Sequence, residues 1–231
     1  MLQPPASRLI DPPVTAPADM NLDELRAALA PLVPAHAAFD GWTERAIAMA
    51  ATELGVPADR ARLVFKGPVD MIDAWFDALD KAMLAAFPPE TIAEMKVRDR
   101  IRALILFRLE ALAPRREALR RALSILAMPQ NGLAAANLAW RGADRIWRTA
   151  GDAATDFSHY TKRATLIAVY ASTTFVFLDD ADQGLAETRA FLDRRLADVM
   201  RFEKAKASWR GTRARLPSLS RFLGRLRYPA V

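Results

Sequence analysis

The fold of this chain is indicated most directly by residues 43–65, TERAIAMAATELGVPADRARLVF. Apolar residues recur every three to four positions in the first half of this stretch, which is typical of an amphipathic helix. Thr43 suits the N-cap of that helix, and Gly55 suits the position after its last residue. A turn at Gly55-Val56-Pro57 and a second, short helix over 58–65 would complete the spacing of a helix-turn-helix motif.

The same helical period continues on both sides of this stretch, and no alternation typical of strands persists. Pro and Gly residues divide the pattern. We therefore expect an all-α chain with further helices from near Leu22 to Pro31, over 69–87, 91–113, 115–128, 133–150 and 155–178, and around 191–202. This order predicts four parts: a disordered lead (1–20), a helix-turn-helix-like domain (21–88), a larger helical bundle (89–206) and a tail (207–231).

Residue usage excludes several kinds of site. The 231 residues include no Cys and only two His, so disulfides and thiolate or multi-His metal sites are not expected. No P-loop, Gly-x-Gly-x-x-Gly or Gly-x-Ser-x-Gly motif is present. Asp156 and His159 lie three residues apart on one helix face, but this pair has too few ligands for a closed metal site. We therefore expect no metal and no cofactor, and we rank an enzyme that uses this pair lowest among the possible functions.

The positive charge of the chain is concentrated in its tail. Residues 1–203 hold 25 Lys and Arg against 27 Asp and Glu, whereas residues 204–231 hold eight Lys and Arg and no acid. A helix over 218–227 would place apolar side chains on one face and arginines opposite, a pattern typical of interfacial helices. We prefer a membrane or a partner helix to a solvated tail or an RNA-binding arm, and the candidate membrane-binding residues are Trp209, Leu219, Phe222, Leu223 and Leu226.

The helix-turn-helix spacing also raises the possibility of DNA binding. A DNA-reading helix needs basic and amide side chains to reach phosphates and base edges. Residues 58–66 supply Arg60, Arg62 and Lys66 but no Asn, Gln, Ser or Thr, and the body outside the tail is slightly acidic. A scaffolding role for these helices is therefore favoured, nucleic acid is not expected as a partner, and a DNA-binding regulator remains the alternative.

Two apolar features are predicted to lie in the core. The longest apolar run, 164–178, is shorter than the roughly 20 residues needed to cross a bilayer, so we interpret it as a buried core helix. The stripe Leu133, Trp140 and Trp147 is likewise interpreted as core, although a bundle lined by Met and aromatic residues can also enclose an apolar ligand. The N-terminus has neither the apolar segment of a secretory signal nor the Arg-rich character of a mitochondrial transit peptide.

A specific resemblance is found at residues 151–164, GDAATDFSHYTKRA. Together with weaker matches at 41–43, 95–101, 120–123 and 191–195, this block resembles the accessory lipid-binding family of ubiquinone (coenzyme Q) biosynthesis, over about residues 22–206. The resemblance implies a fold like that of the TetR regulators, an N-terminal helix-turn-helix-like triplet, a larger bundle that binds lipid and dimerises, and an amphipathic C-terminal helix at the membrane. The chain departs from the family at His159, where Trp is usual.

The same resemblance implies a function without bond chemistry. Family members are not themselves enzymes; they bind isoprenoid lipid and dock the di-iron demethoxyubiquinone hydroxylase, to which they present the quinone intermediate. The candidate partner-binding residues are Trp147, Asp156, His159, Tyr160 and Arg163. An apolar cavity within 90–203 would hold the lipid, an isoprenoid or a phospholipid, and the candidate lipid-binding residues are Leu104, Trp140, Tyr170 and Phe175. We expect a homodimer in the cytoplasm, peripheral on the inner face of the cytoplasmic membrane.

Overall fold

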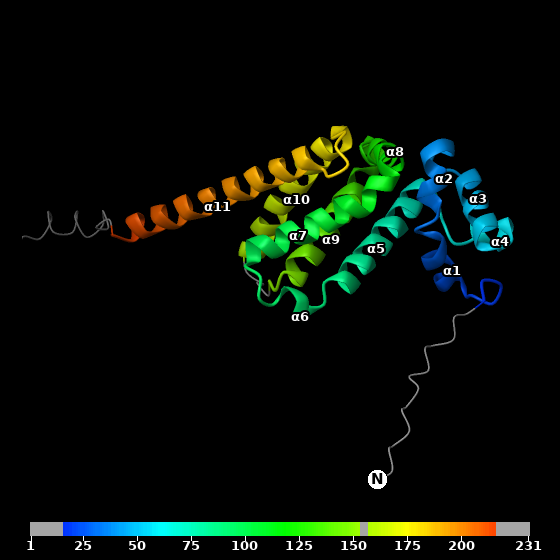
Figure 1. Cartoon of the computed structure of the whole chain (residues 1–231), viewed down its shortest axis with the longest axis horizontal. Helices are drawn as coiled ribbons and strands as arrows, with labels where there is room; N and C mark the ends of the chain where they lie inside the picture. The colour runs from blue at the N-terminus through cyan, green and yellow to red at the C-terminus, as the bar shows by residue number, and fades with distance from the viewer. Residues whose placement is uncertain (1–15, 153–156, 216–231) are drawn as a thin grey trace, which may run out of the picture.

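A computed structural model describes residues 16–152 and 157–215 of the chain, with the side chains of 157 and 202–215 left out (Figure 1). Within these residues all regular elements are helices, so the all-α prediction is confirmed. The α-helices are α1 Leu22–Leu29, α2 Val33–Asp40, α3 Glu44–Leu54, α4 Ala58–Arg62, α5 Pro68–Ala86, α6 Pro89–Ile92, α7 Val97–Leu112, α8 Arg116–Leu126, α9 Gly132–Thr149, α10 Phe157–Asp179 and α11 Ala186–Arg215.

Helices α1 to α4 form a compact group at one end of the molecule (Figure 1). Thr43 is the N-cap of α3 and Gly55 ends it in the left-handed conformation, with φ of 77°, as the sequence predicted. A side chain at Gly55 would strain this turn, because residues with a Cβ disfavour positive φ. Helix α4 ends at Arg62, three residues before the predicted end.

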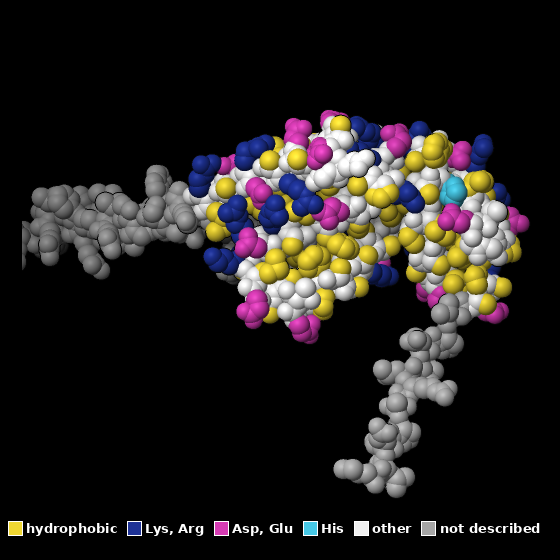
Figure 2. All heavy atoms as spheres, viewed as in Figure 1, with side chains coloured by type: hydrophobic (Ala, Val, Ile, Leu, Met, Phe, Trp, Pro, Cys, Tyr) yellow, Lys and Arg dark blue, Asp and Glu magenta, His cyan; other side chains and the backbone are white. Residues whose placement is uncertain are grey.

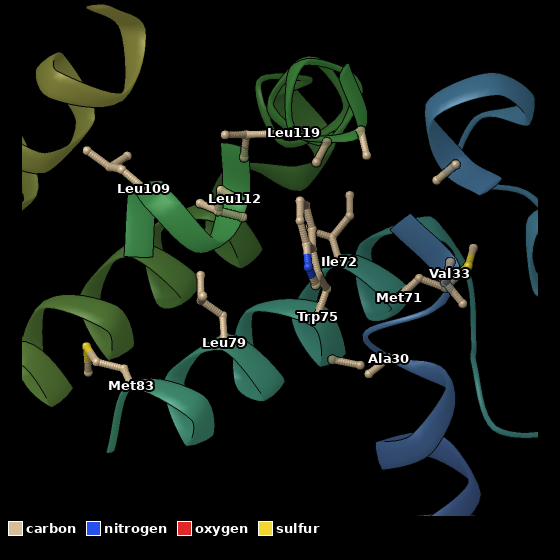
Figure 3. Close-up of a cluster of buried hydrophobic side chains, with 14 of the residues drawn as sticks. Ala30, Val33, Met71, Ile72, Trp75, Leu79, Met83, Leu109, Leu112 and Leu119 are labelled. Atoms are coloured by element: carbon tan, nitrogen blue, oxygen red, sulfur yellow. The ribbon is translucent and has the colours of Figure 1, made fainter. Parts of the chain in front are cut away.

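Helix α5 joins this group to the rest of the molecule. Met71 lies toward Val33 of α2, whereas Leu79 lies toward Leu112 of α7 (Figure 3). The indole nitrogen of Trp42 also donates a hydrogen bond to the backbone carbonyl of Ala118 in α8, at 3.1 Å. One hydrophobic core therefore runs through both predicted helical domains, and α5 packs against α7, α8 and α9 as well as against α1 and α2.

Helices α7 to α10 form the larger bundle, and α11 packs along α10 and α7. The predicted helix over 91–113 is divided into α6 and α7, with a break before Val97. Helix α11 continues through the predicted domain boundary at 206/207. It contains no proline, and the first proline after it is Pro217. Its C-terminal part extends beyond the end of the bundle (Figure 1). The predicted helix over 218–227 lies outside the described residues.

Two predictions about buried segments were wrong in part. Leu133 is 77% exposed, because α9 is covered by its neighbours only around Gly142, Ala143 and Ile146. Helix α10 is buried on one side only, and Phe175 is 65% exposed on the other, because α10 lies at the outside of the bundle. Both helices therefore carry apolar side chains that no other described part of the chain covers.

Candidate lipid cavity and adjoining surface

A cavity of about 700 Å³ opens between α5, α7, α8, α9 and α10. Its wall is mainly apolar, and the α9 side of it consists largely of small residues, among them Ala135, Ala139 and Gly142. Protein interiors are normally packed to the density of organic crystals, so a space of this size is not a packing defect. Its volume and lining fall within the range of ligand pockets.

The rim of the cavity is partly polar. Arg120 of α8 and Asp179 of α10 form an ion pair there, with 2.9 Å between Nη2 and Oδ1. Both side chains are largely exposed, so the pair contributes little stability. Phe175 lies at the same rim and is available to an apolar ligand that enters the cavity.

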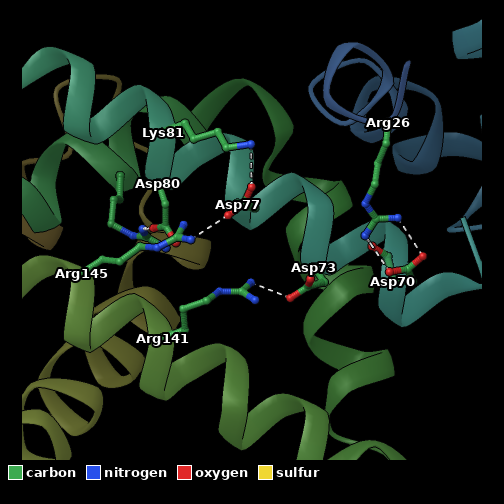
Figure 4. A network of polar contacts seen from close by, with 9 residues as sticks. Arg26, Asp70, Asp73, Asp77, Asp80, Lys81, Arg141 and Arg145 are labelled. Atoms are coloured by element: carbon green, nitrogen blue, oxygen red, sulfur yellow. Dashed lines mark hydrogen bonds and ion pairs between the residues drawn. The ribbon is translucent and has the colours of Figure 1, made fainter. Parts of the chain in front are cut away.

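The cavity also has a charged floor. Arg108 of α7 is buried and binds Asp80 of α5, and its Nε donates to the Tyr170 hydroxyl at 3.2 Å. Arg145 of α9 binds the second oxygen of Asp80 at 2.7 Å and Asp77 at 2.8 Å (Figure 4). Burial alone would raise the pKa of Asp77, but the hydrogen bonds from Lys81 and Arg145 hold that pKa below its usual range. The ion pairs of the floor tie α5, α7 and α9 together.

A surface of aromatic rings lies where α9 meets the start of α10. The ring centroid of Trp140 is 5.9 Å from that of Tyr160 and 6.2 Å from that of His159. Tyr160 is 60% exposed, whereas Trp140 and His159 are half-buried. Rings at these distances stabilise one another and form a rigid apolar patch.

Buried polar contacts hold this aromatic surface in place. Arg163 is only 1% exposed and binds Asp144 of α9 at 2.7 Å and Asp152 at 3.2 Å. The indole nitrogen of Trp147 donates to the backbone carbonyl of Lys162 at 3.0 Å. Burial alone would raise the pKa of Asp152, but hydrogen bonds from Lys162 and Arg163 hold it below its usual value.

The structure separates the predicted site residues. Tyr170 and Phe175 line the cavity, whereas Leu104 is enclosed in the core and Trp140 lies in the aromatic surface. Lipid contact at all four positions stays a prediction.

The partner-binding candidates are also divided. His159 and Tyr160 lie in the aromatic surface, Trp147 and Arg163 support it from within, and Asp156 lies outside the described residues. Among the membrane-binding candidates, Trp209 belongs to α11, where the structure describes its backbone only. The other four lie outside the described residues.

The charged floor was missed by the sequence reasoning, although a signal was present. Arg108 occupies an inward position between Leu104 and Leu112, at the spacing of the buried face of α7. Charged side chains are rarely buried without a partner. An arginine on this face therefore predicts an acid facing it from another helix.

Comparison with known proteins shows similarity to one family. A profile of the COQ9 family matches residues 133–203, which cover α9, α10 and the first part of α11. The human mitochondrial ubiquinone biosynthesis protein COQ9 is 34% identical over 175 residues, 73% of this chain and 54% of the human protein. The Drosophila melanogaster protein of the same name is 26% identical over 187 residues, 79% of this chain and 57% of that protein.

The resemblance inferred from residues 151–164 is thereby confirmed, although the chain spans only about half the length of the curated COQ9 relatives that it matches. Those relatives are named as mitochondrial, and a location on a bacterial membrane stays a prediction for this chain.

The TetR-like fold is confirmed by a solved structure, a TetR transcriptional regulator from Nitrosomonas europaea. The two structures match with a TM-score of 0.61 and 27% sequence identity. The match covers 75% of this chain and 96% of the regulator chain.

The described residues contain neither a bilayer-spanning helix nor a cluster of metal ligands. None of the helices in that part of the chain is both long and apolar enough to span a bilayer. No cluster of three or more His, Asp or Glu side chains suited to a metal ion occurs among residues 16–152 and 157–201.

Proposed function

We propose that this protein is a non-catalytic accessory protein of ubiquinone biosynthesis, which binds an isoprenoid lipid and presents quinone intermediates to the membrane-bound demethoxyubiquinone hydroxylase. The observation that carries this proposal is the apolar cavity of about 700 Å³ between α5 and the bundle helices. Support also comes from COQ9 relatives, whose names place them in ubiquinone biosynthesis. The prenyl chain would lie against the apolar walls, where burial of its surface favours binding.

The cavity can be tested by filling it. Replacing Ala135, which lines the cavity, with tryptophan is expected to reduce co-purifying isoprenoid or phospholipid several-fold, because the indole would occupy the space of the lipid. Lipid would be identified and counted by mass spectrometry of the purified protein. The matched control is Ala136→Trp, since Ala136 is the next residue, is exposed and does not line the cavity. Wild-type protein that carries no lipid and binds none from vesicles would disprove the proposal.

The aromatic surface around Tyr160 is the proposed contact with the hydroxylase. Exposed aromatic side chains held by rigid neighbours are typical of residues that dominate binding energy. Tyr160→Ala is expected to weaken the affinity for purified hydroxylase about tenfold or more, as measured by surface plasmon resonance. Phe39→Ala serves as the control, because Phe39 is 85% exposed on α2, far from α9 and α10 in the chain. An equal loss in the two variants would contradict this assignment.

Membrane contact through the tail and a homodimer are further parts of the proposal. Helix α11 extends past the bundle (Figure 1), and its last turns belong to the basic segment 204–231, which would attract an anionic leaflet. The exposed apolar side chains of Leu133 and Phe175 support a dimer contact on α9 and α10.

A DNA-binding regulator is the weaker alternative. Arg60 of α4 donates to the backbone carbonyls of Ala18 and Met20, and Arg62 pairs with Asp59 and Glu44. On the face shown in Figure 2, the acidic and basic side chains of the N-terminal helices lie interspersed and form no basic stripe. Such a stripe is the usual footprint of nucleic-acid binding. Sequence-specific gel shifts lost on replacing Arg60 and Arg62 would favour the regulator.

A further inference from the structure

The floor of the cavity contains an arginine with an unused donor. Arg108 is 3% exposed; its Nη1 binds Asp80 and its Nε binds the Tyr170 hydroxyl. Its Nη2 has no hydrogen-bond partner among the residues that the structure describes. A Cβ placed on Gly142, which also lines the cavity, would lie 3.6 Å from this Nη2. The glycine therefore leaves the donor open toward the cavity.

A second donor lies next to the first. The guanidinium carbon of Arg108 is 5.4 Å from the centre of the Tyr170 ring, and the hydroxyl oxygen accepts from Arg108. That hydroxyl donates no hydrogen bond within the described part of the chain, so its proton is available to a ligand. Arg108 and Tyr170 both line the open cavity, and a few polar groups in a mainly apolar pocket usually fix the orientation of its ligand. Two unused donors in one apolar cavity therefore indicate an acceptor supplied by the ligand.

The surrounding charges decide which acceptor suits the floor. Asp80 is bound by both Arg108 and Arg145, and Arg145 also binds Asp77 (Figure 4). The charge of Arg108 is thus already matched within the floor by Asp80, so the ligand needs to supply a hydrogen-bond acceptor and not a negative charge. An uncharged carbonyl oxygen fits better, because its two lone pairs can accept one hydrogen bond from each donor.

We propose that Arg108 and Tyr170 bind the carbonyl oxygen of an amphiphile, so that the ligand enters the cavity with its polar end first. Its apolar chain then runs along Leu119 and Leu138 toward the rim at Phe175. This inference rests on the proposed function, since it assigns an orientation and an acceptor to the lipid in that cavity. The carbonyl belongs to a quinone ring or to an acyl ester, and these two sources are distinguished by experiment.

Three probes with the same hexyl chain separate these cases in calorimetric titrations of the full chain: a hexyl-substituted ubiquinone analogue, a hexyl ester and hexylbenzene. Wild-type protein is expected to bind one carbonyl probe about tenfold more tightly than hexylbenzene. Tighter binding of the quinone identifies a ring carbonyl, and tighter binding of the ester identifies an acyl lipid. Tyr170→Phe is expected to lower the affinity for the carbonyl probe several-fold and to leave the affinity for hexylbenzene unchanged.

Gly142→Ala provides a second variant that keeps both donors but covers Nη2 with a methyl group. The 3.6 Å separation is an ordinary van der Waals contact, so the variant should fold, and it is expected to weaken carbonyl binding by a similar factor. Thr165→Val, which removes an exposed hydroxyl from the same helix as Tyr170, is the matched control.

Equal binding of all three probes by wild-type protein would overturn the inference and leave the proposed function standing. The same holds if neither variant reduces carbonyl binding. Failure of every probe to bind, together with the absence of co-purified lipid, would instead overturn the proposed function.

Discussion

Replacing Asp80 with alanine is expected to lower the free energy of unfolding by about 3–5 kcal/mol, because it leaves the buried Arg108 without its counter-ion. Asp80 is itself almost fully buried, and each of its oxygens binds an arginine from a different helix, α7 or α9. Thermal unfolding followed by circular dichroism measures the effect, at about 2–4 °C per kcal/mol for a chain of this size.

Two companion variants test the cause of this loss. Asp73→Ala on the same helix breaks the ion pair with Arg141 at 2.5 Å, but both partners are about one-third exposed, so a cost of at most about 1 kcal/mol is expected. Adding Arg108→Met to Asp80→Ala should restore much of the lost stability, since an apolar pair replaces an uncompensated charge. If Asp80→Ala alone is as stable as Asp73→Ala, water must compensate the charge of Arg108. The floor of the cavity would then be hydrated.

The fold could be predicted largely from local signals. Proline and glycine residues divide the chain into helices, and Thr43 and Gly55 delimit α3 as expected. The block at 151–164 then provided the family and with it the TetR-like arrangement, which the solved regulator structure confirms. Helix ends were less predictable, as α4 and α11 show, because packing and the absence of a helix breaker decide where a helix stops.

The cavity and its floor depend on contacts that periodicity does not encode. A pattern of apolar positions looks the same whether small residues such as Ala135 and Gly142 leave a space or are filled by a neighbouring helix. Burial of Arg163 was not foreseen either, because its partners Asp144 and Asp152 lie on a different helix and in the segment that follows it. Position within the sequence block therefore grouped Arg163 with Tyr160, although the two side chains differ completely in exposure.

Replacing Arg163 with methionine is expected to lower the free energy of unfolding by about 3–5 kcal/mol, which is the usual cost of removing one partner of a buried ion pair. The guanidinium joins Asp144 of α9, Asp152 and the backbone carbonyl of His159 in the first turn of α10. Its removal leaves a nearly buried Asp152 with Lys162 alone. Because these contacts also fix the aromatic surface, the Arg163 variant should bind the hydroxylase more weakly than wild-type protein at temperatures where both are folded.

A control and a pH series distinguish this ion pairing from simple loss of packing. Lys162→Met also removes a cation from Asp152, but Lys162 is more than one-third exposed, so its cost should stay near 1 kcal/mol or below.

The pKa of Asp152 is held below its usual value by these cations despite the opposing effect of burial. Its ionised form therefore stabilises the fold above about pH 4, near the pKa of an unfolded aspartate, and this stabilisation is lost as the pH falls through the lower folded pKa. Denaturant unfolding measures the free energy of unfolding of wild-type protein and of Arg163→Met at each pH. The difference between these two free energies should narrow below about pH 4. A difference that does not change with pH would assign the effect to packing alone.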